Sequence, residues 1–386
     1  MARIEVDGLK KTYGRGGNAV TALDGVSFDV ADGEFFCLLG PSGAGKTTTL
    51  KTIAGLVEPD AGTIRIGEQD VASIEPTHRN LAMCFESYAL YPQLNVFDNM
   101  ASPLRSPRLR LPADEVRQRV QGSADMLGIG HLLERSVTQL SNGQRQRVAL
   151  GRVLVRPAHA YLLDEPLAHL DAKLRATMRA ELKAISQQDK TTSLYVTHDY
   201  VEALSLADRI AVIRNGRILQ VGTPEQVWSE PANAFVAQAF GKPRINAVHG
   251  GLAAGDPDRD GAGGTAGNGD LRFVSGDGAF QIPLPAVDAA PGEEVQIGIR
   301  PRDLALHLGA GDVPAGRVRL SGVVYVLEHL GRQTEVTVQI GQSLISVVVP
   351  RTAVPAMALD DKVGVLIDPS TAHVFLSGDE GRRISP

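Results

Sequence analysis

The chain contains few cysteines and no long apolar run, and both absences limit what it can be. Its 386 residues include two cysteines, Cys37 and Cys84, whereas a disulfide or metal framework needs more cysteines at motif spacing. Both lie in apolar, strand-like segments, so we expect buried thiols that act as small hydrophobes. No apolar run approaches the roughly 18 residues of a membrane-spanning helix, and the N-terminal segment lacks the apolar core of a signal peptide. We therefore expect a cytosolic chain.

An excess of positive charge is also absent. The chain has 39 basic and 44 acidic side chains, which gives a formal net charge of -5. Because no overall positive field favours a nucleic acid, we expect no nucleic-acid partner. The length is sufficient for a substantial core and for two or three domains, so a modular protein is expected.

Two regions of the chain differ in their pattern. In residues 1–235, short apolar runs alternate with helical segments, which is typical of a mostly parallel sheet covered by helices. Within this region, residues 88–156 have no comparable run and predict a helical insert. Residues 236–386 contain short alternating runs separated by Gly, Pro and Asp, which indicate an all-β barrel or sandwich. Residues 250–270 are poor in apolar side chains and predict a mobile loop inside that β domain.

A glycine-rich segment between a buried strand and a helix predicts a phosphate-binding loop. Residues 40–47 fit the pattern G-x-x-x-x-G-K-[ST]. Glycines let backbone N–H groups surround the phosphates, Lys46 balances the terminal phosphates, and the Thr47 hydroxyl can bind Mg²⁺. Thr48 could hold the α-phosphate. The residues predicted to bind nucleotide here are Gly40, Ser42, Gly43, Ala44, Gly45, Lys46, Thr47 and Thr48.

A second apolar strand ends in two carboxylates, Asp164 and Glu165. Asp164 would hold Mg²⁺, and Glu165 would orient or deprotonate the attacking water. Such a pair can also be a solvated turn or a helix cap when it stands alone. The neighbouring phosphate-binding loop favours the hydrolytic interpretation.

Two further side chains are candidates for the same site. His198 ends a third buried run and could hydrogen-bond the γ-phosphate and fix Glu165 or the water, although a lone histidine after a strand is more often structural. Tyr13 precedes a glycine-rich loop and could stack on adenine. A position in the core is the alternative for Tyr13.

Five motifs resemble those of the ATP-binding cassette (ABC) transporter ATPases. They are "GPSGAGKTTTL", "ESYALYP", "LSNGQRQRVALGRVL", "YLLDEPLAHLD" and "YVTHD", in the family's order, within the first 235 or so residues. The resemblance implies an α/β P-loop NTPase cassette with a helical subdomain, followed by an all-β (OB-like) regulatory domain. It also implies ATP and Mg²⁺ as ligands, and it adds Asp171 to the nucleotide-binding residues.

In this family the turn formed by Ser141, Asn142, Gly143 and Gln144 closes over ATP bound to a second ATPase subunit. The physical chemistry of the turn suits that role, because Ser141 can donate its hydroxyl and the following helix directs its positive end at phosphate. The alternative is that Ser141 simply caps the helix. Relatives usually have glycine where Asn142 stands; since Asn tolerates left-handed backbone angles, we expect the turn to persist.

Two departures from the family pattern affect the same site. Glu86 stands where relatives usually have Gln, and the resemblance places it at Mg²⁺ and the attacking water, so an additional carboxylate is expected there. Ala168 and His169 replace the usual Ser-Asn. Ala168 cannot offer a hydroxyl across the dimer interface, which leaves open whether the second ATPase subunit is identical or different.

The resemblance also implies partners and a purpose. It predicts a peripheral protein on the cytoplasmic face of the inner membrane, bound to two transmembrane permease subunits and indirectly to an extracellular or periplasmic solute-binding protein. The motif "IGIRPRDLAL" and the segment from Val323 resemble the regulatory domain of maltose-type importers, which favours a carbohydrate or polyol. Importers of polyamine, iron or sulfate and a soluble, non-transport ABC ATPase are the alternatives. The β domain could also serve only to strengthen dimerisation.

Overall fold

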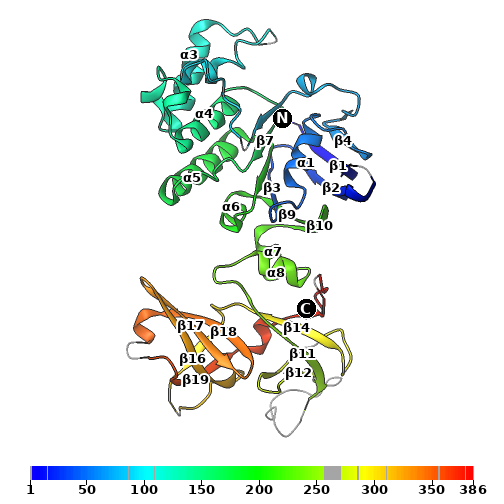
Figure 1. The fold of residues 1–386 in the computed structure, drawn as a ribbon, viewed down its shortest axis with the longest axis vertical. Helices are drawn as coiled ribbons and strands as arrows, with labels where there is room; N and C mark the ends of the chain where they lie inside the picture. Colours follow the sequence, from blue (N-terminus) through cyan, green and yellow to red (C-terminus); the bar gives the residue numbers. More distant parts are fainter. Residues whose placement is uncertain are drawn as a thin grey trace. The chain divides into compact units, whose positions relative to one another are not determined.

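The computed structural model describes residues 2–14, 16–85, 87–107, 109–255, 271–284, 287–309, 311–354, 357–378 and 380–385. The chain divides into two compact units, residues 1–227 and 228–386, each of which is described by itself (Figure 1). The division precedes the boundary expected after residue 235. That boundary would have cut helix α8 (Ala234–Ala239), whose Ala234 and Ala237 pack against Ile245 and Phe375 of the second unit.

The first unit contains two sheets. Its strands are β1 (Ile4–Tyr13), β2 (Val20–Val30), β3 (Phe35–Leu39), β4 (Ala61–Ile66), β5 (Gln69–Asp70), β6 (Leu81–Cys84), β7 (Ala160–Asp164), β8 (Ser193–Thr197), β9 (Arg209–Arg214) and β10 (Arg217–Gly222). Strands β2-β1-β4-β5 form an antiparallel sheet. Strands β10-β9-β3-β8-β7-β6 form a sheet that is parallel except at its β10–β9 edge. The expected mostly parallel sheet is therefore confirmed.

Three central strands of the parallel sheet position the functional residues. Strands β3, β7 and β8 are buried at every residue, which agrees with their continuous apolar sequences. They lie in the order β3-β8-β7, so the segments that follow their carboxyl ends meet at one edge of the sheet. Ligands of open parallel sheets bind at this edge.

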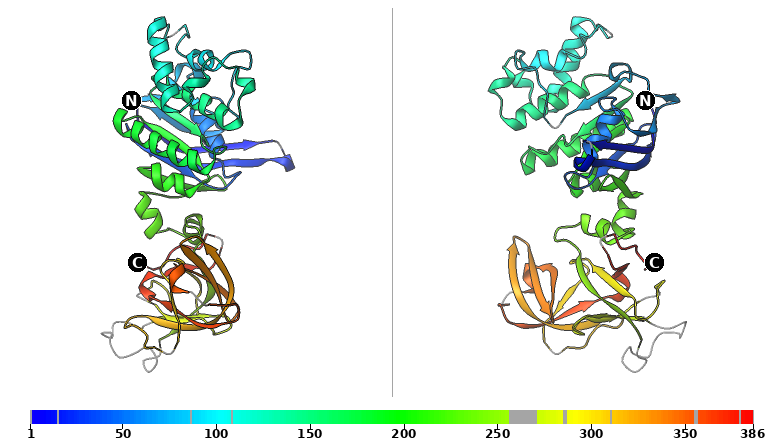
Figure 2. Two further views of the ribbon diagram at one scale, coloured as in Figure 1. Left: turned by 90° about the vertical axis from the view of Figure 1, so that its left-hand side faces the viewer. Right: turned by 45° about the vertical axis from the view of Figure 1, so that its right-hand side comes forward.

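The helices of the first unit are α1 (Lys46–Ile53), α2 (Val96–Ala101), α3 (Ala113–Met126), α4 (Asn142–Leu154), α5 (Ala172–Asp189) and α6 (Tyr200–Leu206). Short 3₁₀ helices cover Gly16–Asn18, Pro76–His78, Gly130–Leu132 and Val137–Gln139. Helices α2, α3 and α4 pack on one another within the range 88–156, where the sequence predicts a helical insert. The β1–β2 hairpin projects from the body of this unit (Figure 2).

One apolar core joins the two sheets of the first unit. Ile4 and Val6 of β1 belong to the same cluster as Leu38 of β3, Leu50 of α1 and Leu194 of β8. Because α1 contributes side chains to this core, the residue at which it begins is fixed against the parallel sheet. Cys37 and Cys84 are buried, unpaired thiols, as expected, and burial raises the pKa of Cys84 to about 12.

The second unit is built mainly from two antiparallel sheets, which agrees with the all-β prediction. Helix α7 (Pro224–Ser229) crosses the division, and α8 follows it. The sheets have the orders β13-β12-β11-β14-β20 and β15-β19-β16-β17-β18 and share one core cluster. Their strands are β11 (Asn246–Ala254), β12 (Leu271–Ser275), β13 (Gln281–Pro283), β14 (Glu294–Ile299), β15 (Ala305–His307), β16 (Val318–Leu330), β17 (Gln333–Ile340), β18 (Ser343–Pro350), β19 (Lys362–Ile367) and β20 (His373–Leu376), with 3₁₀ helices at Arg351–Ala353 and Pro369–Thr371.

The loop expected over residues 250–270 is partly wrong. Residues 250–254 belong to β11, where Gly250 pairs with Ser275 and Gly251 with Val274. A Cβ at Gly250 would lie 2.2 Å from the carbonyl oxygen of Val274, so this glycine allows close strand packing. Residues 256–270 lie outside the described residues. Across the described parts of the chain, no helix combines the length and apolar character needed to cross a membrane.

Candidate nucleotide-hydrolysis site

The loop between β3 and α1 is shaped around Lys46. Gly45 has φ 106°, and a Cβ there would lie 2.5 Å from the carbonyl oxygen of Ala22, so a glycine is required. Lys46 is 5% exposed, and its Nζ donates to the carbonyl oxygens of Gly40 at 2.9 Å and Pro41 at 3.0 Å. Helix α1 begins at this lysine, which leaves unpaired N–H groups at its N-terminus for an anion.

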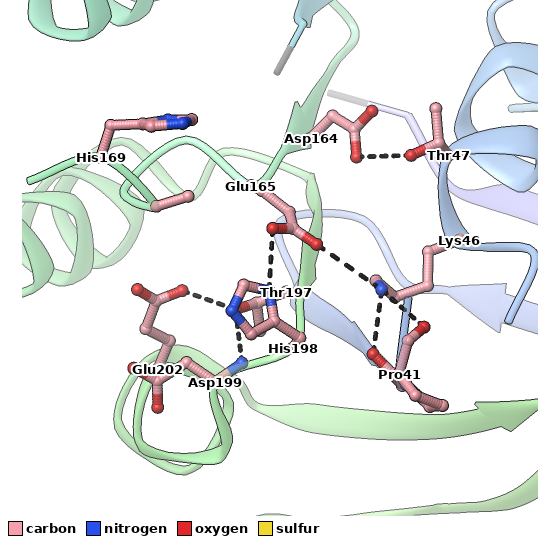
Figure 3. Close-up of polar contacts among 12 residues, drawn as sticks. Pro41, Lys46, Thr47, Asp164, Glu165, His169, Thr197, His198, Asp199 and Glu202 are labelled. Atoms are coloured by element: carbon pink, nitrogen blue, oxygen red, sulfur yellow. Dashed lines mark hydrogen bonds and ion pairs between the residues drawn. The ribbon is translucent and has the colours of Figure 1, made fainter. Parts of the chain in front are cut away.

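Asp164 lies beside this loop. Its side chain is 2% exposed, and its Oδ1 accepts a hydrogen bond from the Thr47 hydroxyl at 3.1 Å (Figure 3). A buried carboxylate requires compensation by hydrogen bonds or by a cation. The oxygen atoms of Thr47 and Asp164 are ligands of the type that Mg²⁺ prefers.

Glu165 lies between two cationic or titratable side chains. Its Oε1 is 3.5 Å from Lys46 Nζ, and its Oε2 is 2.8 Å from His198 Nδ1 (Figure 3). Glu165 is a non-glycine residue with φ 45°, while its N–H donates to the carbonyl oxygen of Val196 at 3.0 Å. Left-handed backbone at a bulky residue costs about 1–3 kcal/mol and persists where the surroundings enforce it. The structure thus brings together the three residues that the sequence derived from separate motifs.

The turn before α4 makes only local side-chain contacts at Ser141. The Ser141 hydroxyl accepts from the N–H of Gln144 at 3.3 Å, and Gln144 Oε1 accepts from the N–H of Ser141 at 3.0 Å. This reciprocal capping box fixes the helix start. Asn142 is the first residue of α4 and is not among the residues with positive φ, so the tolerance of Asn for left-handed angles is not used here.

Gln146, which the sequence did not reveal, connects this helix to the hydrolytic strand end. Its side chain is 2% exposed. Its Nε2 donates to the carbonyl oxygen of Glu165 at 3.3 Å, and its Oε1 accepts from the N–H of His169 at 3.1 Å. The only sequence signal was a polar residue on the face of α4 that also carries buried Val153 and Leu150. A single amide therefore links α4 to the segment after β7.

Ala168 and His169, which replace the Ser-Asn that is usual in the family, lie in the segment after β7. The exposed His169 ring contacts the Tyr88 ring edge-on, with 5.6 Å between ring centroids, and in Figure 3 it lies away from Lys46 and Thr47. Asp171 caps α5, since its Oδ1 accepts from the N–H of Leu174 at 2.9 Å. Among the residues that the structure describes, neither Asp171 nor His169 contacts the Lys46 loop.

Two further residues, Tyr13 and Glu86, were predicted to lie at the nucleotide site. Tyr13 is 42% exposed at the end of β1, which excludes the core alternative, and Lys11 Nζ lies 5.8 Å from its ring centroid. Its strand pairs with β2, which carries Ala22 next to Gly45. Glu86 lies outside the described residues, so its expected approach to Mg²⁺ stays a prediction.

The arrangement defines a P-loop ATPase of the cassette type, and comparisons with known proteins agree. A family model described as ABC transporter matches residues 23–168, and one described as TOBE domain matches residues 314–374. The trehalose/maltose import ATP-binding protein MalK of Thermococcus litoralis is 44% identical over 88% of this chain and 89% of its own length. The sn-glycerol-3-phosphate import ATP-binding protein UgpC 1 of Rhizobium etli is 40% identical over 99% of both chains.

The chain belongs to the ATP-binding subunits of ABC transporters, which are ATPases. A dimeric structure of a post-hydrolysis state of the ATP-binding cassette MJ0796, bound to ADP and Pi, aligns with a TM-score of 0.54 and 29% identity. The alignment covers 57% of this chain and 98% of that one. The fold class expected from the sequence, a cassette followed by an all-β OB-like domain, is thereby confirmed.

Proposed function

We propose that the chain hydrolyses ATP, together with Mg²⁺, to energise an ABC importer for a carbohydrate or polyol. The observation that carries the hydrolytic part is the position of Glu165, which contacts both Lys46 of the phosphate loop and His198 of the neighbouring strand end. A carboxylate so placed can accept a proton from a water that attacks the γ-phosphate. Lys46 would balance the phosphate charge, and His198 would hold Glu165 in position.

The metal part of the proposal rests on the pair of Thr47 and Asp164. Their oxygens lie 3.1 Å apart and would both turn to a bound Mg²⁺, with Glu86 as a third ligand. When bound, Mg²⁺ neutralises charge on the β- and γ-phosphates. Among the described residues, no group of three or more His, Cys, Asp or Glu side chains could enclose a metal. The two oxygens therefore suit an ion that is also held by phosphate and water.

The carboxylate at residue 86 has its own consequence. Two like charges about 4 Å apart cost on the order of 4 kcal/mol at an effective dielectric constant of 20, and a divalent cation between them reverses the sign. Glu86 should make the site more dependent on Mg²⁺ than glutamine would. The test compares the ATPase rate against Mg²⁺ concentration for the native chain and Glu86→Gln; superimposable curves would exclude this role.

A second ATPase subunit completes the proposed site. Ser141, Asn142, Gly143 and Gln144 would face the γ-phosphate of ATP held by the partner, with Asp171 near the interface. The support is that Ser141 and Gln144 satisfy each other and leave the N-terminus of α4 at an exposed position. Two solved structures of the similar cassette MJ0796 are dimeric, which supports a second subunit. Homodimer and heterodimer stay alternatives because of Ala168 and His169.

The membrane side of the proposal concerns two permease subunits and an external solute-binding protein. ATP-driven closure would move residues 88–156 and switch the permease between inward and outward access. The chain would then lie on the cytoplasmic face of the membrane, with residues 1–235 as the ATPase domain and 236–386 as the regulatory domain. The relatives named for trehalose, maltose and glycerol-3-phosphate import favour the carbohydrate or polyol class over polyamine, iron or sulfate.

The decisive experiment uses Glu165→Gln in the full chain. We expect kcat to fall by about 10²–10⁴-fold, because a general base is lost, while ATP binding and ATP-dependent dimers persist. Glu134→Gln, an exposed carboxylate in the helical insert, is the matched control. Unchanged turnover in Glu165→Gln would overturn the hydrolytic assignment.

The solute class needs separate experiments. Co-purified permease subunits should stimulate the ATPase, whereas a soluble non-transport ATPase would be insensitive to them. A screen of sugars, polyols, polyamines, iron and sulfate against the solute-binding protein encoded beside this chain should select a sugar or polyol. Selection of another solute would keep the ATPase assignment and refute the carbohydrate class.

A further inference from the structure

A buried carboxylate behind the hydrolytic pair has no part in the function proposed above. Glu202, in the first turn of α6, is 3% exposed. Its Oε2 accepts two hydroxyl hydrogen bonds, from Tyr195 at 2.9 Å and from Thr197 at 2.7 Å. Burial raises the pKa of Glu202, and these two hydrogen bonds oppose the rise. A buried carboxyl group is costly, so its retention at this position calls for a reason.

Thr197 connects this carboxylate to the turn that carries His198. The Thr197 hydroxyl has one proton, which it donates to Glu202, and its oxygen accepts from the N–H of Asp199 at 2.9 Å. The Thr197 hydroxyl therefore bridges the residues on both sides of His198, because Thr197 precedes it and Asp199 follows it. Because the direction of the hydroxyl proton is set by Glu202, the shape of the turn depends on a residue that is several positions away.

The other side of the turn is held by Arg175. Its Nη1 lies 3.5 Å from Asp199 Oδ2, and its Nη2 donates to the carbonyl oxygens of Leu170 at 3.0 Å and Ala168 at 3.5 Å. These carbonyls belong to the segment that directly follows Glu165. The two loops that carry Glu165 and His198 are thus joined at their bases as well as through their side chains.

A small cavity lies among these groups. It has a volume of about 30 Å³ and is lined by Glu165, Ala168, Arg175, Thr197, His198, Asp199 and Glu202. That volume holds about one water molecule and cannot admit a nucleotide. Because Glu202 is 3% exposed, it can influence hydrolysis only through the groups that it holds.

We propose that Glu202 is a positioning residue for ATP hydrolysis, which acts through the Thr197 hydroxyl to fix the turn that presents His198 to Glu165. In Figure 3 the dashed lines run continuously from Glu202 to Thr197 and Asp199, and from His198 through Glu165 to Lys46. The inference rests on the proposed roles of His198 and Glu165. Displacement of a reacting group by about 1 Å can lower a rate by about 10²-fold, so loss of this anchor should be visible in kcat.

The chain offers a matched pair of variants for the test. Thr197→Val and Tyr195→Phe each remove one hydroxyl from the same carboxylate oxygen, and both side chains are buried on β8. Only the Thr197 hydroxyl also bonds the turn around His198. In the full chain, Thr197→Val should lower kcat by about 10–100-fold with an unchanged affinity for ATP. Tyr195→Phe should lower Tm but leave kcat within about two-fold of the native chain.

Rescue and a second variant separate positioning from loss of folding. Thr197→Ser keeps the hydroxyl and should restore most of the kcat that Thr197→Val loses. Should the valine variant fail to fold, Glu202→Met keeps a similar volume but removes the oxygen that accepts both hydroxyl groups, and it should reduce kcat per folded molecule several-fold at unchanged ATP affinity. Equal kcat losses in Thr197→Val and Tyr195→Phe, or an unchanged kcat in Glu202→Met, would overturn the proposal.

The background of His198→Ala distinguishes this inference from the function on which it rests. If Glu202 acts through His198, Thr197→Val should have little further effect on kcat once His198 is replaced. An additive loss would refute the positioning role alone. A His198→Ala variant with native kcat would instead refute the proposed role of His198 and, with it, this inference.

Discussion

Lys46 in the first unit and Arg300 in the second are both buried cations that donate to two backbone carbonyls, yet they have different roles. In the first unit, Lys46 donates to Gly40 and Pro41. In the second unit, Arg300 is 6% exposed and donates to the carbonyls of Trp228 at 2.6 Å and Phe240 at 3.2 Å. The local hydrogen bonding is therefore nearly the same in both.

The surroundings of the two cations decide what each does. Lys46 also faces the carboxylate of Glu165 at the start of a helix, where an anion can be bound. Arg300 instead stacks on the Trp228 ring, 3.7 Å from its centroid, and burial lowers its pKa to about 10. A buried cation thus indicates a site when it is accompanied by reactive groups, and a structural support when its neighbours are carbonyls and an aromatic ring.

Replacement of the lysine gives the largest expected effect. Lys46→Met should lower kcat/KM for ATP by about 10²–10³-fold, because a preorganised positive charge at the phosphates is lost. Stability should also fall, by about 1–3 kcal/mol, because methionine cannot donate to the carbonyls of Gly40 and Pro41. Steady-state ATPase assays and calorimetric melting of the same preparation measure both quantities. If Lys46→Met lowers stability while turnover stays normal, Lys46 is a structural support and the contrast with Arg300 is refuted.

The corresponding change in the second unit should affect stability alone. Arg300→Met removes two charge-assisted hydrogen bonds and a cation–π contact, so the free energy of unfolding of that unit should fall by about 2–4 kcal/mol. ATPase turnover per folded molecule should be unchanged. The fluorescence of Trp228, the single tryptophan of the chain, reports unfolding directly. Loss of turnover without loss of stability would count against a purely structural arginine.

Acid should distinguish the two units further. Burial, and then repulsion from Arg383 and Arg300, lowers the pKa of His373 to about 4. Because the unfolded chain binds a proton at His373 below about pH 6.5 and the folded chain does not, the second unit should lose about 1–3 kcal/mol of stability as the pH falls from about 6.5 to 4. Urea unfolding followed by Trp228 fluorescence at several pH values measures this loss.

A control identifies the histidine responsible. His373→Phe should flatten the pH dependence, whereas the same change at the exposed His329 of the same unit should not. If the slope survives in His373→Phe, the acid sensitivity arises from another group.

The smallest predicted effect concerns an exposed residue. Ser141→Ala and Ser136→Ala each remove an N-cap hydroxyl, and each should cost about 1 kcal/mol or less of stability. Only Ser141→Ala should also lower kcat, by about ten-fold, if its hydroxyl reaches ATP on a second subunit. Chromatography with mass analysis would show whether ATP-dependent dimers weaken in parallel. Identical kcat values in Ser141→Ala and Ser136→Ala would show that Ser141 acts as a helix cap alone.

The sequence predicted the parts of the site that depend on local patterns. The phosphate loop, Glu165 and His198 each follow a recognisable buried strand, Asp164 ends one, and parallel strands bring their carboxyl ends to one edge. It did not reveal Gln146 or Glu202, because their importance arises from partners distant in the chain that only the fold brings close.

The same limit applies to the architecture. Alternating apolar runs identified the sheet-rich regions and the helical insert. The strand at Gly250 was missed because its glycine-rich sequence resembles linker composition, although Gly250 allows close strand packing. Amino-acid composition indicates how much apolar surface a residue can bury, but it does not indicate how closely the neighbouring strand packs against that residue.

The amide of Gln146 has a mechanical consequence for an assembled pair. In each subunit it fastens the helix start that would serve the partner's ATP to the strand end that carries the subunit's own base. A shift of either element is thereby transmitted to the other. In the pair of subunits proposed above, phosphate release at one nucleotide would therefore displace the α4 start that faces the other nucleotide through one buried side chain.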